Sequence, residues 1–193
     1  MKPSLLLDVD NVQRAFTTKA FEIYRRDFDS DSKYSIDDVN VFDLSPFFTK
    51  LPYSIIDFIS DYAEELFFES DPFEDNISEI VSGLKDFYFI HVVTHQFKGV
   101  EHYTFKWLKR FNIDYDAVSF VKDKSLIKGH LLVDDGAHNL DSLMAEGVDV
   151  VCINRPWNRS WREAHPNNPS FSSLGEFLSA YDHESIVRKY LSK

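Results

Sequence analysis

The sequence contains little cysteine, an excess of negative over positive charge, and no long apolar run. Cys152 is the only cysteine among the 193 residues, which excludes an intrachain disulfide and a cluster of thiolate metal ligands. No apolar stretch approaches the roughly 20 residues that a membrane-spanning helix needs. The first apolar run starts at Ser4, which leaves no room for a signal peptide. We therefore expect a protein of the cytoplasm with no membrane partner.

The shortage of positive charge limits the ligands that the chain can bind. It has 21 Lys and Arg against 32 Asp and Glu, for a formal net charge of −11. Non-specific binding to a nucleic-acid polymer or to an anionic membrane needs the opposite sign. A small phosphorylated ligand remains compatible, because a metal ion and one or two cations can invert the potential locally.

The apolar residues that are present indicate a folded α/β domain. Hydrophobic residues make up 44% of the chain, and 18 of its residues are Phe, which is not the composition of a disordered protein. Short apolar runs with helical patterns between them predict a parallel sheet with helices on both faces. The five predicted strands are residues 4–9, 87–93, 117–121, 130–134 and 148–153.

One acidic and aromatic segment interrupts this alternation. Residues 15–75 contain no clear strand and one strong helical pattern, over 54–70. The simplest interpretation is a mainly helical insertion after the first strand, with residues 1–14 and 76–193 forming the α/β core. From residue 170 onward the pattern predicts one or two surface helices.

Polar side chains gather where the predicted strands end. The first strand is followed by Asp8 and Asp10, the second delivers Thr94, and the fourth delivers the pair 134–135, Asp-Asp. In open parallel sheets, ligands bind outside these carboxyl ends. Four converging carboxylates would repel one another unless a cation relieves them, and oxygen ligands without His or Cys favour Mg²⁺. One of the lysines just before the fourth strand, which are Lys122, Lys124 and Lys128, could neutralise a phosphoryl group.

The order of these residues resembles the four motifs of the haloacid dehalogenase superfamily of phosphohydrolases. The matching residues are DVDNV at 8–12, Thr94, Lys124 and Asp134-Asp135. More narrowly, residues 103–111, 121–140 and 153–159 resemble the 5′(3′)-deoxyribonucleotidases and their phage and bacterial relatives. The resemblance implies a Rossmann-like core whose five-stranded parallel sheet has the order 5-4-1-2-3, covered by a small helical cap inserted after strand 1.

The resemblance also implies a role for each motif residue. The first acid would attack phosphorus to form an aspartyl-phosphate, and the second would move protons to the leaving oxygen and from water. Mg²⁺ would be bound by two carboxylates and one main-chain carbonyl. The residues implied are Asp8 as nucleophile and metal ligand, Asp10 as acid/base and, through its carbonyl, metal ligand, Asp134 as metal ligand, Asp135 behind it, and Thr94 and Lys124 as phosphate ligands.

Residues at the rim of the site are harder to assign. Asn11 stands where the family usually has Gly, and Asn is the side chain that best tolerates left-handed backbone geometry. Cap aromatics commonly stack on the base in this family, although packing inside the cap is the more ordinary role for each one. Candidates from the insertion are Phe16, Tyr24, Phe42, Phe47 and Phe48, and the rim is expected to include Asn11, Phe16, Phe47, Arg155 and Trp157. For Arg155 and Trp157, packing at the sheet edge is the competing interpretation.

The sequence thus predicts a Mg²⁺-dependent phosphomonoesterase that acts on (deoxy)nucleoside monophosphates. A phosphatase for another small phosphoester, such as a sugar phosphate or a polynucleotide 3′ end, is an open alternative, as is an inactive binding protein with the same fold. A phosphoacceptor receiver domain is set aside, because its acidic pair would come early rather than last. The base preference, 5′ or 3′ specificity and the formation of a homodimer stay open.

Overall fold

The computed structural model of the protein describes residues 2–191. Its centre is a sheet of six parallel strands in the order β3-β2-β1-β4-β5-β6. The strands are β1 (Ser4–Leu7), β2 (Phe89–Thr94), β3 (Ala117–Phe120), β4 (Leu131–Asp134), β5 (Asp149–Ile153) and β6 (Ser170–Phe171). The predicted fold class is confirmed, and the first five strands have the order that the resemblance implied.

The sheet has one strand more than the five predicted. Strand β6 pairs Ser170 with Cys152 and Phe171 with Ile153 at the outer side of β5. Its two residues are too few to form an apolar run, so only the pairing with β5 makes them a strand. Up to residue 191, the rest of the tail contains two helices, as expected.

Helices cover both faces of the sheet. Helices α3, α4 and α7 pack on one face through a large apolar cluster, and α5 and α6 pack on the other. The helices of the core are α3 (Ile77–Lys85), α4 (Glu101–Arg110), α5 (Ala137–Ala145), α6 (Arg159–Ala164), α7 (Leu174–Ala180) and α8 (His183–Leu191). The central strand β1 is buried from both sides, which explains its unbroken run of leucines. None of the described helices is long and apolar enough to cross a membrane.

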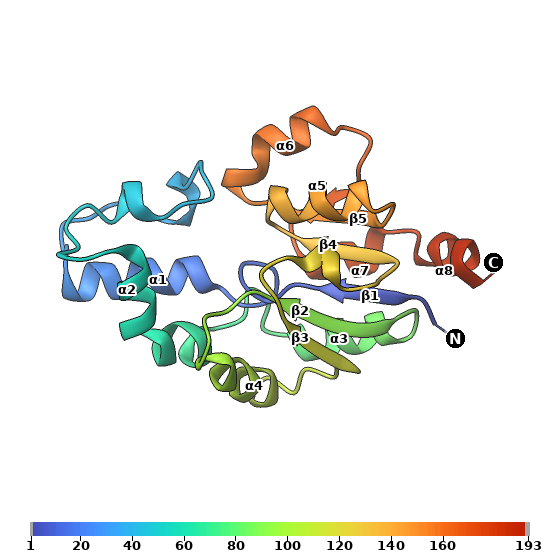
Figure 1. Cartoon of the computed structure of the whole chain (residues 1–193), viewed down its shortest axis with the longest axis horizontal. Coiled ribbons are helices and arrows are strands. Elements are labelled where there is room, and N and C mark those ends of the chain that lie inside the picture. Colours follow the sequence, from blue (N-terminus) through green and yellow to red (C-terminus); the bar gives the residue numbers. More distant parts are fainter. Residues whose placement is uncertain (1, 192–193) are drawn as a thin grey trace.

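The segment after β1 forms the expected helical insertion. It contains α1 (Phe16–Asp27), α2 (Ile55–Asp61) and a π-helical turn, η3 (Glu65–Glu69), and it lies beyond the carboxyl ends of the strands (Figure 1). The single helix predicted over 54–70 is wrong, because α2 ends at Asp61 and the chain widens into η3. The insertion has its own aromatic core, in which Phe48 stacks on Tyr24 at 4.4 Å between ring centroids.

The buried side chain of His183 connects helix α8 to the core through hydrogen bonds. His183 is 4% exposed, its Nδ1 lies 2.9 Å from the Tyr88 hydroxyl, and its Nε2 lies 3.0 Å from the Leu178 carbonyl oxygen. Since a carbonyl only accepts, Nε2 carries a hydrogen and the ring is neutral when Tyr88 donates to Nδ1. Burial lowers the pKa of His183, partly opposed by the carbonyls that it faces.

This lowered pKa predicts a loss of stability in mild acid. The unfolded chain takes up a proton on His183 near its ordinary pKa of 6.5, whereas the folded protein does so only at lower pH. The contribution of His183 is therefore complete above that value and declines as the pH falls below it, by at most about 1.4 kcal/mol per pH unit. Denaturant unfolding of the wild type and His183→Gln at pH 8 and pH 5.5 should show a smaller stability difference at the lower pH. An equal difference at both values would contradict this account.

Candidate active site

Three buried carboxylates meet where neighbouring strands end. Asp8 directly follows β1, Asp134 ends β4, and Asp135 comes next. Because β1 and β4 are adjacent and parallel, their carboxyl ends lie side by side. One carboxylate oxygen of each of the three residues lies within 4.8 Å of the others. Three of the four acids expected at the sheet edge are thus brought together within one cluster.

A single buried lysine balances part of this charge. The Nζ of Lys124 lies 2.7 Å from Oδ1 of Asp8 and 2.6 Å from Oδ2 of Asp134. Lys124 opens a short 3₁₀ helix, η4 (Lys124–Leu126), after β3, and the side chain of Asp123 accepts a hydrogen bond from Ser125 N at its start. This turn directs the lysine inward, so it is only 3% exposed.

Burial and the surrounding negative charge raise the pKa values of Asp8 and Asp135. Burial, followed by repulsion from Asp134, raises the pKa of Asp8 to about 7, although Lys124 opposes the shift. Burial and the charges of Asp134 and Asp8 raise the pKa of Asp135 well above its ordinary range. For Lys124, burial lowers the pKa, but the charges of Asp134 and Asp8 raise it by more, so the net shift is upward. A buried triad of oxygen ligands with incomplete neutralisation suggests a divalent metal site.

Hydrogen bonds fix the orientation of the two acids at the end of β4. Asp134 accepts a hydrogen bond from Gly136 N at 2.7 Å and from Asn139 Nδ2 at 3.1 Å. Asp135 Oδ2 accepts one from the Trp157 indole at 2.9 Å. Trp157, expected at the rim, therefore orients an acid of the cluster. Asn139 carried no signal in the sequence beyond its place in a helix.

The loop after Asp8 is a tight turn that Asn11 permits. Asn11 has a φ of 60°, a left-handed value that Asn adopts more readily than most residues. Its Oδ1 accepts a hydrogen bond from Thr17 N, and its carbonyl accepts one from Arg155 Nε at 2.8 Å. Arg155 is 8% exposed and supports the turn through this hydrogen bond. It was expected at the rim, but it is not among the residues that line the two pockets at this loop.

The two pockets adjoin each other. The acid pocket, of about 140 Å³, is lined by the residues Asp8, Asp10, Asn11, Phe42, Thr94, His95, Lys122, Lys124, Asp135, His138 and Asn139. The apolar pocket, of about 210 Å³, is lined by the residues Asn11, Phe16, Thr17, Val39, Val41, Phe42, Asp43, Leu44, Ile55, Ile59 and Trp157. Asn11 and Phe42 belong to both linings. A ligand with a charged end and an apolar end would therefore fit across them.

The aromatic candidates from the insertion divide into two groups. Phe16 and Phe42 line the apolar pocket, and the Phe42 ring meets His138 of the core at 4.9 Å between centroids. Tyr24, Phe47 and Phe48 are buried in the core of the insertion and line neither pocket. Phe47 therefore lies away from the rim where it was expected.

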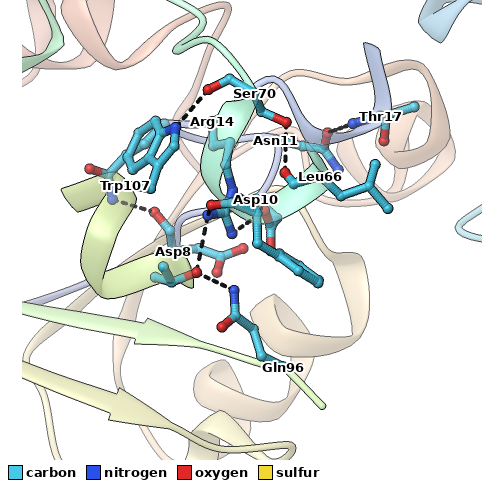
Figure 2. A network of polar contacts seen from close by, with 12 residues as sticks. Asp8, Asp10, Asn11, Arg14, Thr17, Leu66, Ser70, Gln96 and Trp107 are labelled. Atoms are coloured by element: carbon cyan, nitrogen blue, oxygen red, sulfur yellow. Dashed lines mark hydrogen bonds and ion pairs between the residues drawn. The ribbon is translucent and has the colours of Figure 1, made fainter. Parts of the chain in front are cut away.

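The residue that the sequence patterns most clearly missed is Arg14. Its side chain is completely buried, and its Nε donates to Oδ1 of Asp10 at 2.8 Å, as Figure 2 shows. Two further residues were also missed. Gln13 donates from Nε2 to the Asp8 carbonyl at 2.8 Å, and His95, whose pKa is lowered by burial and by Lys122, lines the acid pocket. No periodic pattern or motif marks any of the three in the sequence.

Comparison with known proteins places the chain in a family. The sequence model described as 5′ nucleotidase, deoxy (pyrimidine), cytosolic type C protein matches residues 2–168. No curated protein sequence matches the chain.

Solved structures of low sequence identity share the fold. A haloacid dehalogenase family hydrolase from Deinococcus radiodurans, with bound phosphate and sodium, has a TM-score of 0.62 at 11% identity, over 96% of this chain and 97% of that one. The hydrolase YfnB from Bacillus subtilis, bound to magnesium, has a TM-score of 0.60 at 16% identity, over 94% and 99%. A haloacid dehalogenase-like hydrolase from Xanthomonas campestris has a TM-score of 0.61 at 8% identity, over 100% and 99%.

Proposed function

The chain belongs to the family of cytosolic type C 5′-deoxynucleotidases, which are phosphomonoesterases, and from this premise we propose that it hydrolyses (deoxy)nucleoside monophosphates through a covalent intermediate on Asp8. The observation that carries the proposal is the pair of adjoining pockets, one acidic and one apolar, that share Asn11 and Phe42. The phosphate would occupy the first and the nucleoside the second.

The proposed reaction has two steps, and the two acids of the first loop divide the work. A carboxylate oxygen of Asp8 attacks phosphorus, the bond from phosphorus to the sugar oxygen breaks, and Asp10 gives that oxygen a proton. Asp10 then takes a proton from water as the water oxygen attacks phosphorus. The bond to Asp8 breaks, and inorganic phosphate leaves with both acids restored. Asp10 lines the acid pocket with Asp8, which supports this division.

The residues present fit a divalent cation, and we assign Mg²⁺. The Asp8 and Asp134 carboxylates and the main-chain carbonyl of Asp10 would hold it, with Asp135 adding charge from the same cluster. When bound, Mg²⁺ would neutralise the carboxylates and the phosphoryl oxygens. Oxygen ligands without His or Cys are the donor set that Mg²⁺ prefers. The magnesium bound to the similar hydrolase from Bacillus subtilis supports this assignment.

The substrate would be held at both ends by residues that already face the pockets. Thr94 and Lys124 line the acid pocket and would bind phosphate oxygens, the lysine through charge and the hydroxyl through a hydrogen bond. Phe16, Phe42 and Trp157 line the apolar pocket and would contact the nucleoside. An aromatic lining favours a planar base over the hydroxyl-rich surface of a sugar phosphate.

Phosphate release from a panel of phosphomonoesters tests this function. The panel contains deoxy- and ribonucleoside 5′- and 3′-monophosphates, sugar phosphates, a 3′-phosphorylated oligonucleotide and an aryl phosphate, each with Mg²⁺ and with a chelator. We expect chelator to abolish release and kcat/KM to favour nucleoside monophosphates over sugar phosphates by about tenfold or more, about 1.4 kcal/mol. Equal turnover of sugar phosphates would contradict the nucleoside assignment. Release that survives chelation would contradict the metal. Asp8→Asn protein, purified in the same way as the wild type, controls for contaminating phosphatases.

A further inference from the structure

Arg14 is an arginine whose charge is buried away from water. Its side chain has no exposed area, whereas the side chain of Asp10, with which it pairs, keeps 20% of its own. Burying a guanidinium is costly unless it is paired and its hydrogen bonds are satisfied. Within residues 2–191, its charged partner is Asp10. The carboxylate of Asp10 therefore compensates the buried charge of Arg14.

The geometry of this pair is one-sided. Nε of Arg14 donates to Oδ1 of Asp10 at 2.8 Å, and Nη2 lies 2.7 Å from that same oxygen. Both contacts use Oδ1, so Oδ2 is the oxygen they leave for the acid pocket. These two contacts hold Oδ1 of Asp10 in place beside the guanidinium. The arrangement thus suits a group that gives and takes a proton while its orientation stays fixed.

The other end of the guanidinium binds the insertion and the core at once. Nη1 donates to the main-chain carbonyl of Phe67 in η3 and to the hydroxyl of Thr104 in α4, the latter at 3.0 Å. The guanidinium also lies 5.4 Å from the ring of Trp107, whose indole donates to the Ser70 carbonyl at 2.8 Å. Figure 2 shows Arg14, Trp107 and Ser70 grouped above Asp10. Arg14 therefore sits where η3 packs against α4.

We propose that Arg14 is a positioning residue for Asp10, and that it makes the orientation of this acid depend on the seating of the insertion on the core. The proposal rests on the function proposed above, in which Asp10 moves the protons. If the insertion shifts, the Phe67 carbonyl moves with it and Arg14 loses a partner. Asp10 would then lose the orientation that both steps require. Asp10 would thus be aligned for proton transfer only when the insertion is packed against the core.

A comparison of Arg14→Lys with Asp10→Asn tests the proposal. Lysine keeps the buried charge but cannot form the same fork of contacts. For a nucleoside monophosphate we expect Arg14→Lys to lower kcat about 10- to 100-fold, part of the 10²- to 10⁴-fold that acid/base catalysis contributes, while KM changes less than about threefold. The double variant should be no slower than Asp10→Asn alone, because both changes act through one group.

A second substrate separates positioning from general damage to the site. The nitrophenolate of 4-nitrophenyl phosphate leaves without a proton, so Asp8 can still be phosphorylated when Asp10 is misplaced. We expect Arg14→Lys to release a burst of about one nitrophenolate per active site, followed by slow turnover limited by hydrolysis. Arg110→Lys is the matched control, because Arg110 donates to the neighbouring Phe68 carbonyl from α4 without contacting Asp10. It should behave like the wild type.

The outcomes distinguish failure of the proposal from failure of the proposed function. Wild-type kcat in Asp10→Asn would overturn the proton-transfer role itself. Loss of kcat in Asp10→Asn with wild-type kcat in Arg14→Lys would overturn the positioning role alone, as would additive losses in the double variant. If Arg14→Lys does not fold, Thr104→Val decides, since it removes one partner of the guanidinium and keeps the charge. A lowered kcat with unchanged KM would support the proposal, and an unchanged kcat would overturn it.

Discussion

Replacing Asp8 with asparagine is expected to abolish phosphate release from nucleoside monophosphates. Asparagine has the same shape but no anionic oxygen to attack phosphorus, so kcat should fall by about 10⁴-fold or more, as it does when a nucleophile is removed from other enzymes. The fold should persist, because the change removes one charge from a buried cluster that already has too many. Steady-state phosphate release, with circular dichroism as a check on folding, measures both effects.

An exposed acid supplies the control for this variant. Asp114→Asn changes a carboxylate that pairs with Lys85 at the surface, so it should leave kcat unchanged. Asp8→Asn activity within tenfold of the wild type would rule out the nucleophile assignment. If activity and the fold are lost together, the role of Asp8 is decided by trapping the phosphorylated enzyme in a background that retains this residue.

Replacing Lys124 with methionine should impair both folding and turnover. Methionine fills much the same space but leaves Asp8 and Asp134, at 2.7 and 2.6 Å from the present ammonium, without their shared cation. Breaking a buried ion pair costs about 3 to 5 kcal/mol, and loss of the cation from the phosphate site should lower kcat about 10²- to 10³-fold. Denaturant unfolding without metal and phosphate release with Mg²⁺ measure the two quantities.

Added Mg²⁺ separates the two effects of the lysine. A divalent cation restores positive charge to the cluster, so it should recover part of the lost stability but little of the turnover, because the ammonium would still be missing from the phosphate. Lys128→Met, at an exposed position four residues along, is the matched control and should resemble the wild type. A stable Lys124→Met protein with normal turnover would show that the lysine is dispensable.

The strands and the acids at their ends could be predicted because each leaves a local pattern. Buried parallel strands appear as apolar runs, and the residues that follow them must lie at one edge of the sheet. That is why Asp8, Thr94 and Asp134 could be placed from the order of residues alone. The prediction of one continuous helix over 54–70 is wrong because packing determines the backbone there: Leu66 and Phe67 are buried in the core of the insertion.

Arg14 could not have been found in this way. It is a lone arginine in an irregular loop, and its partners Phe67 and Thr104 lie 53 and 90 residues away in the chain. Only the seating of the insertion brings them together. Phe47 is the opposite case, a residue that was predicted at the site but lies elsewhere. An aromatic side chain that lines a pocket and one that packs inside the insertion look the same in sequence.

The measurement that most directly tests the central claim is a search for the phosphorylated enzyme. Asp10→Asn protein with Mg²⁺ would be mixed with 4-nitrophenyl phosphate, quenched in acid within the first turnover, digested and analysed by mass spectrometry. Because phosphorylation of the enzyme can proceed while its hydrolysis is slowed, we expect one added phosphoryl group on the peptide that contains Asp8, and none in Asp8→Asn/Asp10→Asn. A phosphoryl group on another residue, or nitrophenolate release with no phosphorylated enzyme, would contradict Asp8 as the nucleophile.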